Sequence, residues 1–375
     1  MVKYLYASKD ATIYEQYPSK NTGVDAILEL SKITEGYSVN TNLEDEFYPS
    51  TYISRILIQF DLTNISALIS SGKITSNFTA SLILKATEAV SLSFQYDVVA
   101  HAISGSWANG TGFYSNNPSV TNGVSWQFRD SKLSGRIWET GSLGVNSTAS
   151  WATTAGGGVF YTGSGYEVTQ SFNHEFPDIR MNVTPIIRTW LSGSIPNNGF
   201  IVKFPNASEN DSSVLGNIKF FSTETHTIFI PRLEIQWDDS EISGIGDFAE
   251  VTENDYIIHF KNIQESYRDG EVVRMRLSCR PKFPVNTFST SSNYLTEYRL
   301  PSSSYYSVVD YQTEDKIVDF GNGSKISCDS SGNYFKVDMG SFLPERYYKF
   351  QIKSEFDGGD ISKIIDDGFI FKVVR

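Results

Sequence analysis

The chain has 375 residues, too many for one ordinary domain and enough to bury two substantial hydrophobic cores. Its 31 Lys and Arg residues are outnumbered by 43 Asp and Glu residues, the formal net charge is -12, and no basic run offsets it. This balance argues against binding to a nucleic-acid backbone. The chain start lacks a secretory signal, and no stretch approaches the ~18 apolar residues of a membrane span. We therefore expect a cytosolically made protein with neither nucleic acid nor a membrane as a partner.

Short segments with a period of two dominate the first part of the chain. Residues 55–62 read RILIQFDL, and every second residue from Ile56 to Leu62 is apolar. The same alternation returns in residues 91–100 and 199–204, between clusters of Gly, Asn and Ser. Such segments are typical of antiparallel sheets packed face to face. The sequence therefore predicts an all-β protein built from β-sandwiches.

An aromatic loop follows at residues 106–126, which read SWANGTGFYSNNPSVTNGVSW and contain no charged side chain. Trp107, Phe113, Tyr114 and Trp126 are its candidate functional residues. The loop could line a pocket, present a platform for a ligand, or clamp a hydrophobic core. Large aromatic side chains most often bury their rings, so the clamp is the favoured interpretation.

One helix is expected, in NVTPIIRTWLSG. Thr184 is suited to cap it, Pro185 fits the first helical position, and Gly193 can close it after Leu191. The apolar side chains that share one face are those of Ile186, Ile187, Trp190 and Leu191. The pattern predicts one short amphipathic helix lying on a sheet.

A domain boundary is expected after Trp237, because residues 238–250 are acidic and contain few large apolar side chains. We predict a first domain over residues 1–237, an acidic linker over 238–250 and a second domain over 251–375. The second half contains seven alternating segments: YIIHFKNI, EVVRMRLSC, YYSVVDY, KIVDF, YFKVDM, RYYKFQIK and GFIFKVV. Seven short strands in about 130 residues indicate a sandwich of immunoglobulin-like size.

The two cysteines, Cys279 and Cys328, each share a face with apolar neighbours, so both are expected to be buried. They form either an inter-sheet disulfide or a pair of small apolar core residues. The second interpretation is favoured, because the chain start lacks a secretory signal and the cytosol is reducing.

Sequence motifs for catalysis and metal binding are mostly missing. The four histidines are scattered, without the spacing of a zinc site, and no nucleophile elbow or phosphate-binding loop occurs. Asp357, Asp360, Asp366 and Asp367 could bind calcium, but this is a minority interpretation, because acidic surface turns are far commoner. Glycoside hydrolysis is a second minority interpretation, since a pair of carboxylates leaves no local motif. We expect no cofactor, no metal and no enzymatic activity.

The order of motifs in the first domain resembles the DNRLRE family of jelly-roll-like β-sandwiches, found in cell-wall, matrix-associated and phage proteins. The resemblance covers about residues 6–237. It is carried by DATI at residues 10–13, NTG at 21–23, and by Trp107, Gly123, Val124, Trp126, Arg129 and Trp138.

Some members of that family look like carbohydrate-binding modules, which implies a sugar-stacking role for Trp107, Phe113, Tyr114 and Trp126. The interpretation that these aromatics pin the loop to the sheet edge remains the favoured one. This sequence departs from the family at residues 33–51, ITEGYSVNTNLEDEFYPST, an acidic and aromatic insertion. An insertion of this kind is suited to an assembly contact.

Residues 247–375 resemble the C-terminal part of virion structural proteins from contractile-tailed marine and cyanobacterial phages. The similar blocks are MRLSCRPKFPVNTFSTSSNYL, KISCDSSGNYFKVDM, PERYYKFQIK and FIFKVVR. The resemblance implies a structural protein of the tail, baseplate or neck, assembled into the virion in the host cytoplasm, with other phage virion proteins as partners. The alternative is a carbohydrate- or host-receptor-binding module with a surface glycan as its ligand.

Overall fold

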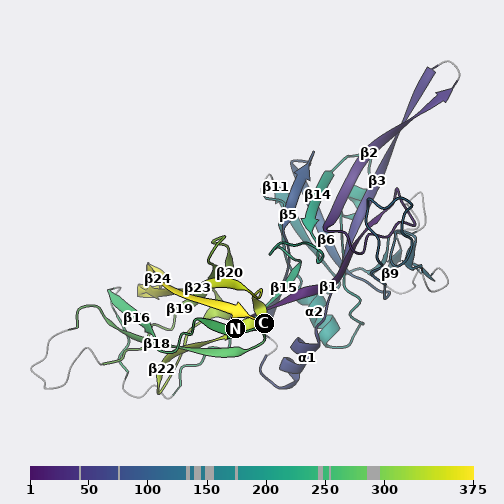
Figure 1. The fold of residues 1–375 in the computed structure, drawn as a ribbon. Coiled ribbons are helices and arrows are strands. Elements are labelled where there is room, and N and C mark those ends of the chain that lie inside the picture. Colours follow the sequence, from purple (N-terminus) through teal and green to yellow (C-terminus); the bar gives the residue numbers. More distant parts are fainter. Residues whose placement is uncertain are drawn as a thin grey trace, which may run out of the picture. The chain divides into compact units, whose positions relative to one another are not determined.

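The computed structural model describes residues 1–41, 44–74, 77–131, 136–138, 145–147, 156–173, 176–243, 248–252, 255–284 and 296–375 (Figure 1). The predicted all-β class and sandwich architecture are confirmed. The chain divides into two compact units. Unit 1 consists of Met1–Tyr4, Leu68–Phe78 and Ile235–Arg375, and unit 2 of Leu5–Ala67 and Thr79–Glu234. Unit 1 is therefore assembled from three separate stretches of sequence.

Unit 2 is built on one network of eleven strands. The main hydrogen-bonded order is β11-β6-β13-β3-β1-β15-β4-β12, while β2 pairs with β3 and with β14, which also pairs with β5. Their bounds are β1 (Val2–Tyr14), β2 (Ile27–Thr41), β3 (Glu44–Phe60), β4 (Phe78–Leu84), β5 (Ala86–Val90), β6 (Gln95–Ala102), β11 (Glu167–Asn173), β12 (Ile179–Asn182), β13 (Phe200–Lys203), β14 (Gly216–Phe221) and β15 (Arg232–Trp237). Two short pairs add β7 (Phe128–Asp130), β8 (Arg136–Ile137), β9 (Val145–Ser147) and β10 (Val159–Tyr161).

Residues 53–58 of strand β3 are buried on both faces, although the alternation of residues 55–62 predicts one polar face. Ile56 and Ile58 are fully buried, as predicted, but Leu57 and Arg55 on the opposite face are fully buried too. Leu57 lies in a core cluster with Trp107 and Trp126 of the aromatic loop. The aromatic loop thus covers the second face of this strand, which a strictly alternating pattern places in solvent.

Helix α2 (Thr184–Leu191) is the helix predicted from the sequence. Ile186, Ile187 and Trp190 are buried. Thr184 is not its N-cap, which is Val183; the Thr184 hydroxyl donates instead to Asn182 Oδ1. Two further short helices were not expected: α1 (Thr63–Ser70) and α3 (Asn206–Asn210).

Unit 1 is a sandwich of a four-stranded sheet, β16-β18-β22-β21, and a five-stranded sheet, β17-β24-β23-β19-β20. Aromatic rings join the sheets: Phe335 of β22 stacks on Tyr306 of β19 at 4.2 Å, and Phe260 of β16 stacks on Phe350 of β23 at 5.4 Å. All seven predicted segments form strands, and β17 and β21 are additional. The bounds are β16 (Tyr256–Phe260), β17 (Ser266–Arg268), β18 (Val272–Pro281), β19 (Ser304–Asp310), β20 (Lys316–Val318), β21 (Ser327–Asp329), β22 (Gly332–Asp338), β23 (Arg346–Phe356) and β24 (Ile361–Val374), with 3₁₀ turns at Asn322–Ser324, Met339–Ser341 and Asp357–Gly359.

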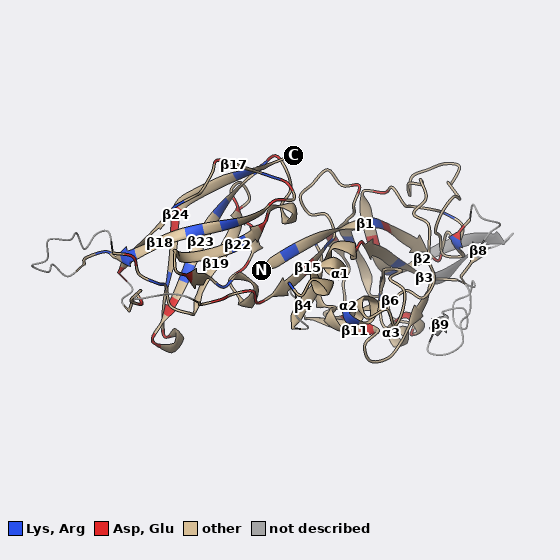
Figure 2. Ribbon diagram, turned by 90° about the horizontal axis from the view of Figure 1, so that it is seen from below, with Lys and Arg blue, Asp and Glu red and all other residues tan. Residues whose placement is uncertain are grey.

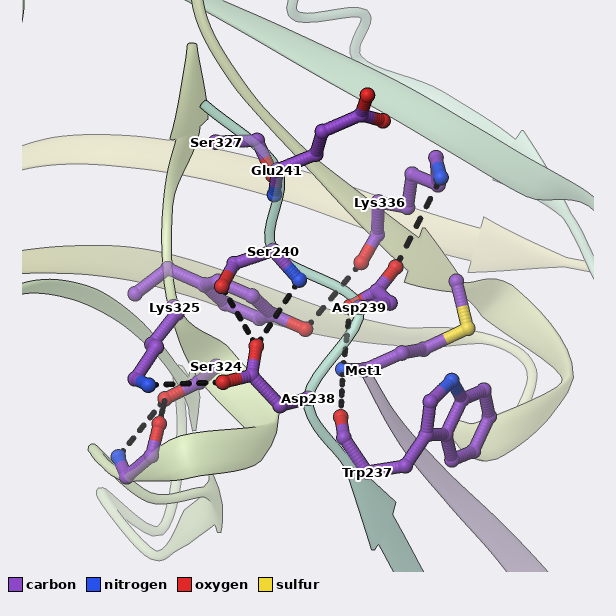
Figure 3. A network of polar contacts seen from close by, with 12 residues as sticks. Met1, Trp237, Asp238, Asp239, Ser240, Glu241, Ser324, Lys325, Ser327 and Lys336 are labelled. Carbon is purple, nitrogen blue, oxygen red and sulfur yellow. Dashed lines mark hydrogen bonds and ion pairs between the residues drawn. The ribbon is translucent and has the colours of Figure 1, made fainter. Parts of the chain in front are cut away.

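The start of the expected linker is tied to unit 1. The amide of Glu241 donates to Ser327 Oγ at 3.1 Å, and Ile242 forms a parallel bridge with Cys328. The amino group of Met1 donates to the Trp237 carbonyl at 2.5 Å and to Asp239 Oδ1 at 2.6 Å (Figure 3). Residues 238–243 therefore extend the hydrogen bonding of the sandwich, and residues 244–247 of the expected linker lie outside the described residues.

Both cysteines are buried, as predicted. Each is a free thiol, Cys279 on β18 and Cys328 on β21. Both strands belong to the four-stranded sheet, with β22 between them, so the inter-sheet arrangement considered for a disulfide is not present. Burial raises the pKa of the Cys279 thiol to about 12.

Candidate functional site

Asn21 organises the aromatic loop from the side of the NTG turn. This side chain is fully buried, and its Nδ2 donates to the carbonyls of Asn109 and Val124, both at 2.7 Å. Its Oδ1 accepts from the amides of Gly112 at 2.8 Å and Gly23 at 3.2 Å. One amide thereby satisfies backbone groups from both arms of the loop, because Asn carries two donors and an acceptor with two lone pairs.

Glycines let the two arms approach each other. Gly123 has a φ of +89°, and a Cβ there would lie 2.4 Å from the Cα of Gly110. A Cβ at Gly110 would lie 2.2 Å from Asn21 Oδ1. Glycine is required here by both backbone conformation and space. These two glycines therefore let the loop close tightly around Asn21.

Trp107 belongs to the clamp rather than to the surface. Its side chain is buried, and its Nε1 donates to the Asn198 carbonyl at 2.9 Å. The ammonium of Lys9 lies 4.1 Å from the indole centroid and also donates to the Trp107 carbonyl. Burial lowers the pKa of Lys9 to about 8. The indole and the ammonium together fix this end of the loop to β1.

Trp126 lies at the centre of the same core. It is fully buried, and the guanidinium of Arg55 lies 4.9 Å from its ring centroid. The nearby Trp138 is also buried and donates from Nε1 to the Ser125 carbonyl at 3.0 Å. Neither Trp107 nor Trp126 presents a ring face to solvent, so these two indoles do not form the sugar-stacking platform considered from the sequence.

Phe113 and Tyr114 are the exposed members of the candidate set, with 45% and 41% of their surface accessible. The Tyr114 ring lies 5.0 Å from that of Tyr14 and 5.9 Å from that of Tyr17. The ammonium of Lys20 lies 4.6 Å from the Tyr114 ring centroid. We call Tyr14, Tyr17, Tyr114 and Lys20 the tyrosine cluster; it provides accessible aromatic surface next to a positive charge.

A buried charge cluster lies beneath the loop and was not found from the sequence. Glu209 of α3 accepts from Arg55 Nη2 at 2.6 Å and lies 2.7 Å from Lys203 Nζ, and all three side chains are fully buried. Arg55 also donates to the Gly157 carbonyl. Desolvation lowers the pKa of Lys203 to about 8, although Glu209 opposes this shift. The three residues are far apart in sequence and form no local motif, so only the fold brings them together.

His101 adjoins this cluster. Burial, with smaller contributions from the charges of Lys203 and Arg55, lowers its pKa to about 3. Its Nδ1 lies 3.1 Å from the Tyr161 carbonyl. The imidazole is therefore neutral near pH 7 and is held as a packed core group against Phe160, with ring centroids 4.5 Å apart.

The insertion predicted at residues 33–51 forms a two-stranded extension of β2 and β3. Their register runs from Ile33 opposite Tyr52 to Thr41 opposite Glu44. β14 pairs with β2 only up to Lys32, and β1 pairs with β3 only from Ser54 onwards. Within the described part of the chain, residues 33–41 and 44–52 thus pair only with each other, and Figure 1 shows them running on beyond the neighbouring strands. We call these residues the ribbon; residues 42 and 43 of the insertion lie outside the described residues.

No group of three His, Cys, Asp or Glu side chains that could hold a metal occurs among the described residues. Asp366, one of the calcium candidates, accepts hydrogen bonds from Lys349 and Gln351, both at 2.9 Å. Its pKa is lowered by these two hydrogen bonds, against the effect of burial. This carboxylate is therefore engaged by the chain itself.

A cavity of about 490 Å³ opens beside the paired ends of β6 and β11. Tyr96 and Phe172 stack there at 4.8 Å, and Ser208 and Leu215 also line it. Among the described residues, the buried Tyr96 hydroxyl has no hydrogen-bond partner, and burial raises its pKa to about 12. The cavity is of a size that holds a small molecule.

Comparisons with known proteins give little further information. No family model and no curated protein matches the chain. One solved structure to which it is similar is a DUF4785 family protein from Legionella pneumophila, with 9% identity and a TM-score of 0.17. The match covers 100% of this chain and 62% of that protein, so the chain spans less than two thirds of its length. A TM-score this low carries no argument about fold or function. None of the described helices has the length and hydropathy of a transmembrane span.

Proposed function

We propose that this chain is a non-enzymatic structural protein of a bacteriophage virion, in the tail, baseplate or neck, and that it bridges neighbouring subunits. The sequence resemblances of both halves support this assignment. The loop around Asn21 supports it as well, since its candidate tryptophans are used for packing rather than for binding a substrate.

The ribbon is the observation that carries the proposal. Its nine residue pairs, from Ile33 opposite Tyr52 to Thr41 opposite Glu44, correspond to roughly 30 Å of extended backbone. A two-stranded ribbon that packs on nothing is at best marginally stable in water. Its outer backbone groups can also pair with another chain. A subunit contact would stabilise such a ribbon.

The proposal is tested by quantitative mass spectrometry of purified particles separated into heads and tails. We expect this chain in the tail fraction at a fixed stoichiometry. A variant in which Asn-Gly replaces residues 36–49 closes the hairpin between Glu35 and Ser50, which are opposite each other in register. We expect this variant to fold and to be lost from particles.

The matched control changes a hairpin of unit 1 instead, by Gly358→Asn at the turn between β23 and β24, where a side chain meets no neighbouring atom. The control should be incorporated at the level of the unmodified chain. Absence of the unmodified chain from particles, or normal incorporation of the shortened ribbon, would contradict the proposal.

Glycan or receptor binding is the second candidate, because the tyrosine cluster leaves Tyr114 accessible beside Lys20. Aromatic rings next to polar groups are suited to sugar rings. Tyr114→Ala should abolish binding on a glycan array if this candidate holds. Trp107→Ala is a poor test, because it removes a buried side chain and destabilises the loop.

A further inference from the structure

The side chain of Lys203 carries an amine into the core of unit 2. Lys203 is the last residue of β13, and its side chain is fully buried. Only two residues separate it from α3: Phe204, which is buried, and Pro205, whose ring fixes its φ at -54°. Asn206 is the first residue of α3. This short connection brings the carboxamide of Asn206 next to the amine of Lys203.

Three oxygen atoms surround the amine nitrogen. Lys203 Nζ donates to the Phe204 carbonyl at 2.6 Å and to Asn206 Oδ1 at 2.7 Å, and it lies 2.7 Å from Glu209 Oε2. Because a C=O bond is ~1.23 Å long, Asn206 Cγ lies at most about 3.9 Å from Nζ. Atoms that react with each other are held ~3 to 3.5 Å apart in a near-attack arrangement. The amine nitrogen and the amide carbon are therefore close to that range.

The charges around Lys203 favour the neutral amine. Arg55, Lys203 and Glu209 are all fully buried, so two cations share one carboxylate. Figure 2 colours basic residues blue and acidic residues red, and it labels α3, the helix of Glu209. Desolvation lowers the pKa of Lys203 to about 8, and about a tenth of such an amine is deprotonated at pH 7. A desolvated lysine beside a second cation is an activated nucleophile.

We propose that Lys203 and Asn206 form an intramolecular amide bond, with Glu209 carrying the protons. Glu209 takes a proton from the ammonium, and the Nζ lone pair attacks Asn206 Cγ. Glu209 then gives its proton to Nδ2 and takes up the second proton that Nζ releases. The bond between Cγ and Nδ2 breaks as the carbonyl forms again, and ammonia leaves with the proton from Glu209. An ammonium side chain and a carboxamide thereby become a secondary amide and an ammonium ion.

The product contains one buried charge fewer. An amide nitrogen is neutral, so Arg55 and Glu209 would remain as a balanced buried pair. Excess buried charge is costly, and its removal favours the reaction. Asn206 is partly exposed, so ammonia can leave to solvent, where dilution prevents the reverse reaction. The bond would tie the end of β13 to the start of α3, and this inference does not depend on the proposed function.

The intact mass of the purified chain, measured after unfolding in acid, tests the bond. We expect a mass about 17 Da below that of the sequence, because one ammonia is lost. Asn206→Ala and Lys203→Met should each have the full mass of their own sequences. Lys203→Met leaves the ion pair of Arg55 and Glu209 in place, so it should fold. The matched control is Asn210→Ala, which changes an exposed asparagine of the same helix and should retain the loss.

Peptide mapping separates this bond from a cyclic imide, which also loses ammonia and forms at Asn-Gly pairs such as Asn109 and Gly110. Trypsin should not cleave after Lys203, and fragmentation should place the loss between Lys203 and Asn206. An intact mass equal to that of the sequence would overturn the inference. A loss that maps to an Asn-Gly pair, or one that persists in Asn206→Ala, would overturn it as well.

Discussion

Asp10 lies on strand β1 in unit 2, and its carboxyl group is buried. Its oxygens accept from the amide of Thr223 at 2.8 Å and from the hydroxyl of the same residue at 2.9 Å. Desolvation outweighs these hydrogen bonds and raises the pKa of Asp10 to about 7. The carboxyl therefore titrates near neutral pH in the folded chain.

The pH dependence of stability follows from this shift. In the unfolded chain Asp10 loses its proton near pH 4, whereas in the folded chain it keeps the proton until about pH 7. The folded state binds more protons between these values, so the stabilising contribution is complete below pH 4 and is lost as the pH rises to about 7. As the pH rises through this range, the free energy of unfolding of the unmodified chain should therefore decrease. We expect Asp10→Asn to make that decrease smaller by roughly 2 to 4 kcal/mol.

Urea unfolding of the unmodified chain and of Asp10→Asn at pH 5 and pH 8 measures the difference. Contributions common to both proteins, such as that of the buried His101, cancel in the comparison. Equal pH dependence in the two proteins would show that Asp10 titrates normally.

At the scale of single residues, the sequence predicted which side chains are buried better than it predicted which residues they contact. The apolar surroundings of Cys279 and Cys328 indicated burial correctly, because that signal is local. The burial of Arg55 was missed, because its partner Glu209 is 154 residues away and its cover is the aromatic loop. The roles of Trp107 and Trp126 could be stated as alternatives only, since packing and ligand binding use the same residue types.

At the scale of elements, the aromatic loop depends on the contact between Gly123 and Gly110. Gly123→Ala should destabilise unit 2 by about 2 to 4 kcal/mol, because its Cβ meets backbone that has no room to move, in addition to the strain of a positive φ. Gly163→Ala is the matched control: its φ is +99°, but a Cβ there meets no neighbouring atom, so only the strain is added. Thermal unfolding followed by tryptophan fluorescence compares the two, and equal losses would argue against the close contact.

Strands were predicted well where their alternation was simple, as in the seven segments of the second half. β3 was predicted only in part, because it pairs with β1 and β13 along one stretch and with β2 along another, and because a loop covers its outer face. Helix α3 was missed because its five residues carry no helical periodicity. The cavity that its Ser208 helps to line is formed mainly by strand residues that are distant in sequence.

At the scale of the whole molecule, the tryptophan side chains and the cysteine thiols can report the unfolding of different units. The buried tryptophans 107, 126, 138 and 190 lie in unit 2, whereas both thiols and the buried Trp237 lie in unit 1. Burial raises the pKa of both cysteines, so the native thiols should react with Ellman's reagent at pH 8 only as unit 1 opens.

In a denaturant series, thiol reactivity should therefore report the opening of unit 1, and tryptophan fluorescence should report mainly unit 2, with a contribution from Trp237 of unit 1. We expect thiol modification in the native chain to be at least ~100-fold slower than in the unfolded chain. Rapid modification without denaturant would show that the four-stranded sheet opens readily.

The divided sequence of unit 1 has a consequence for synthesis. The amide of Tyr4 donates to Ser341 Oγ, a partner 337 residues later in the chain. At 5 to 20 residues per second a ribosome takes about 20 to 70 seconds to make that interval. Every residue of unit 2 is synthesised within it, so unit 2 can fold while the first residues of β1 still lack their partners. Neighbouring nascent chains on one polysome carry the same unpaired strand start, and the time for which it stays open is set by the rate of translation.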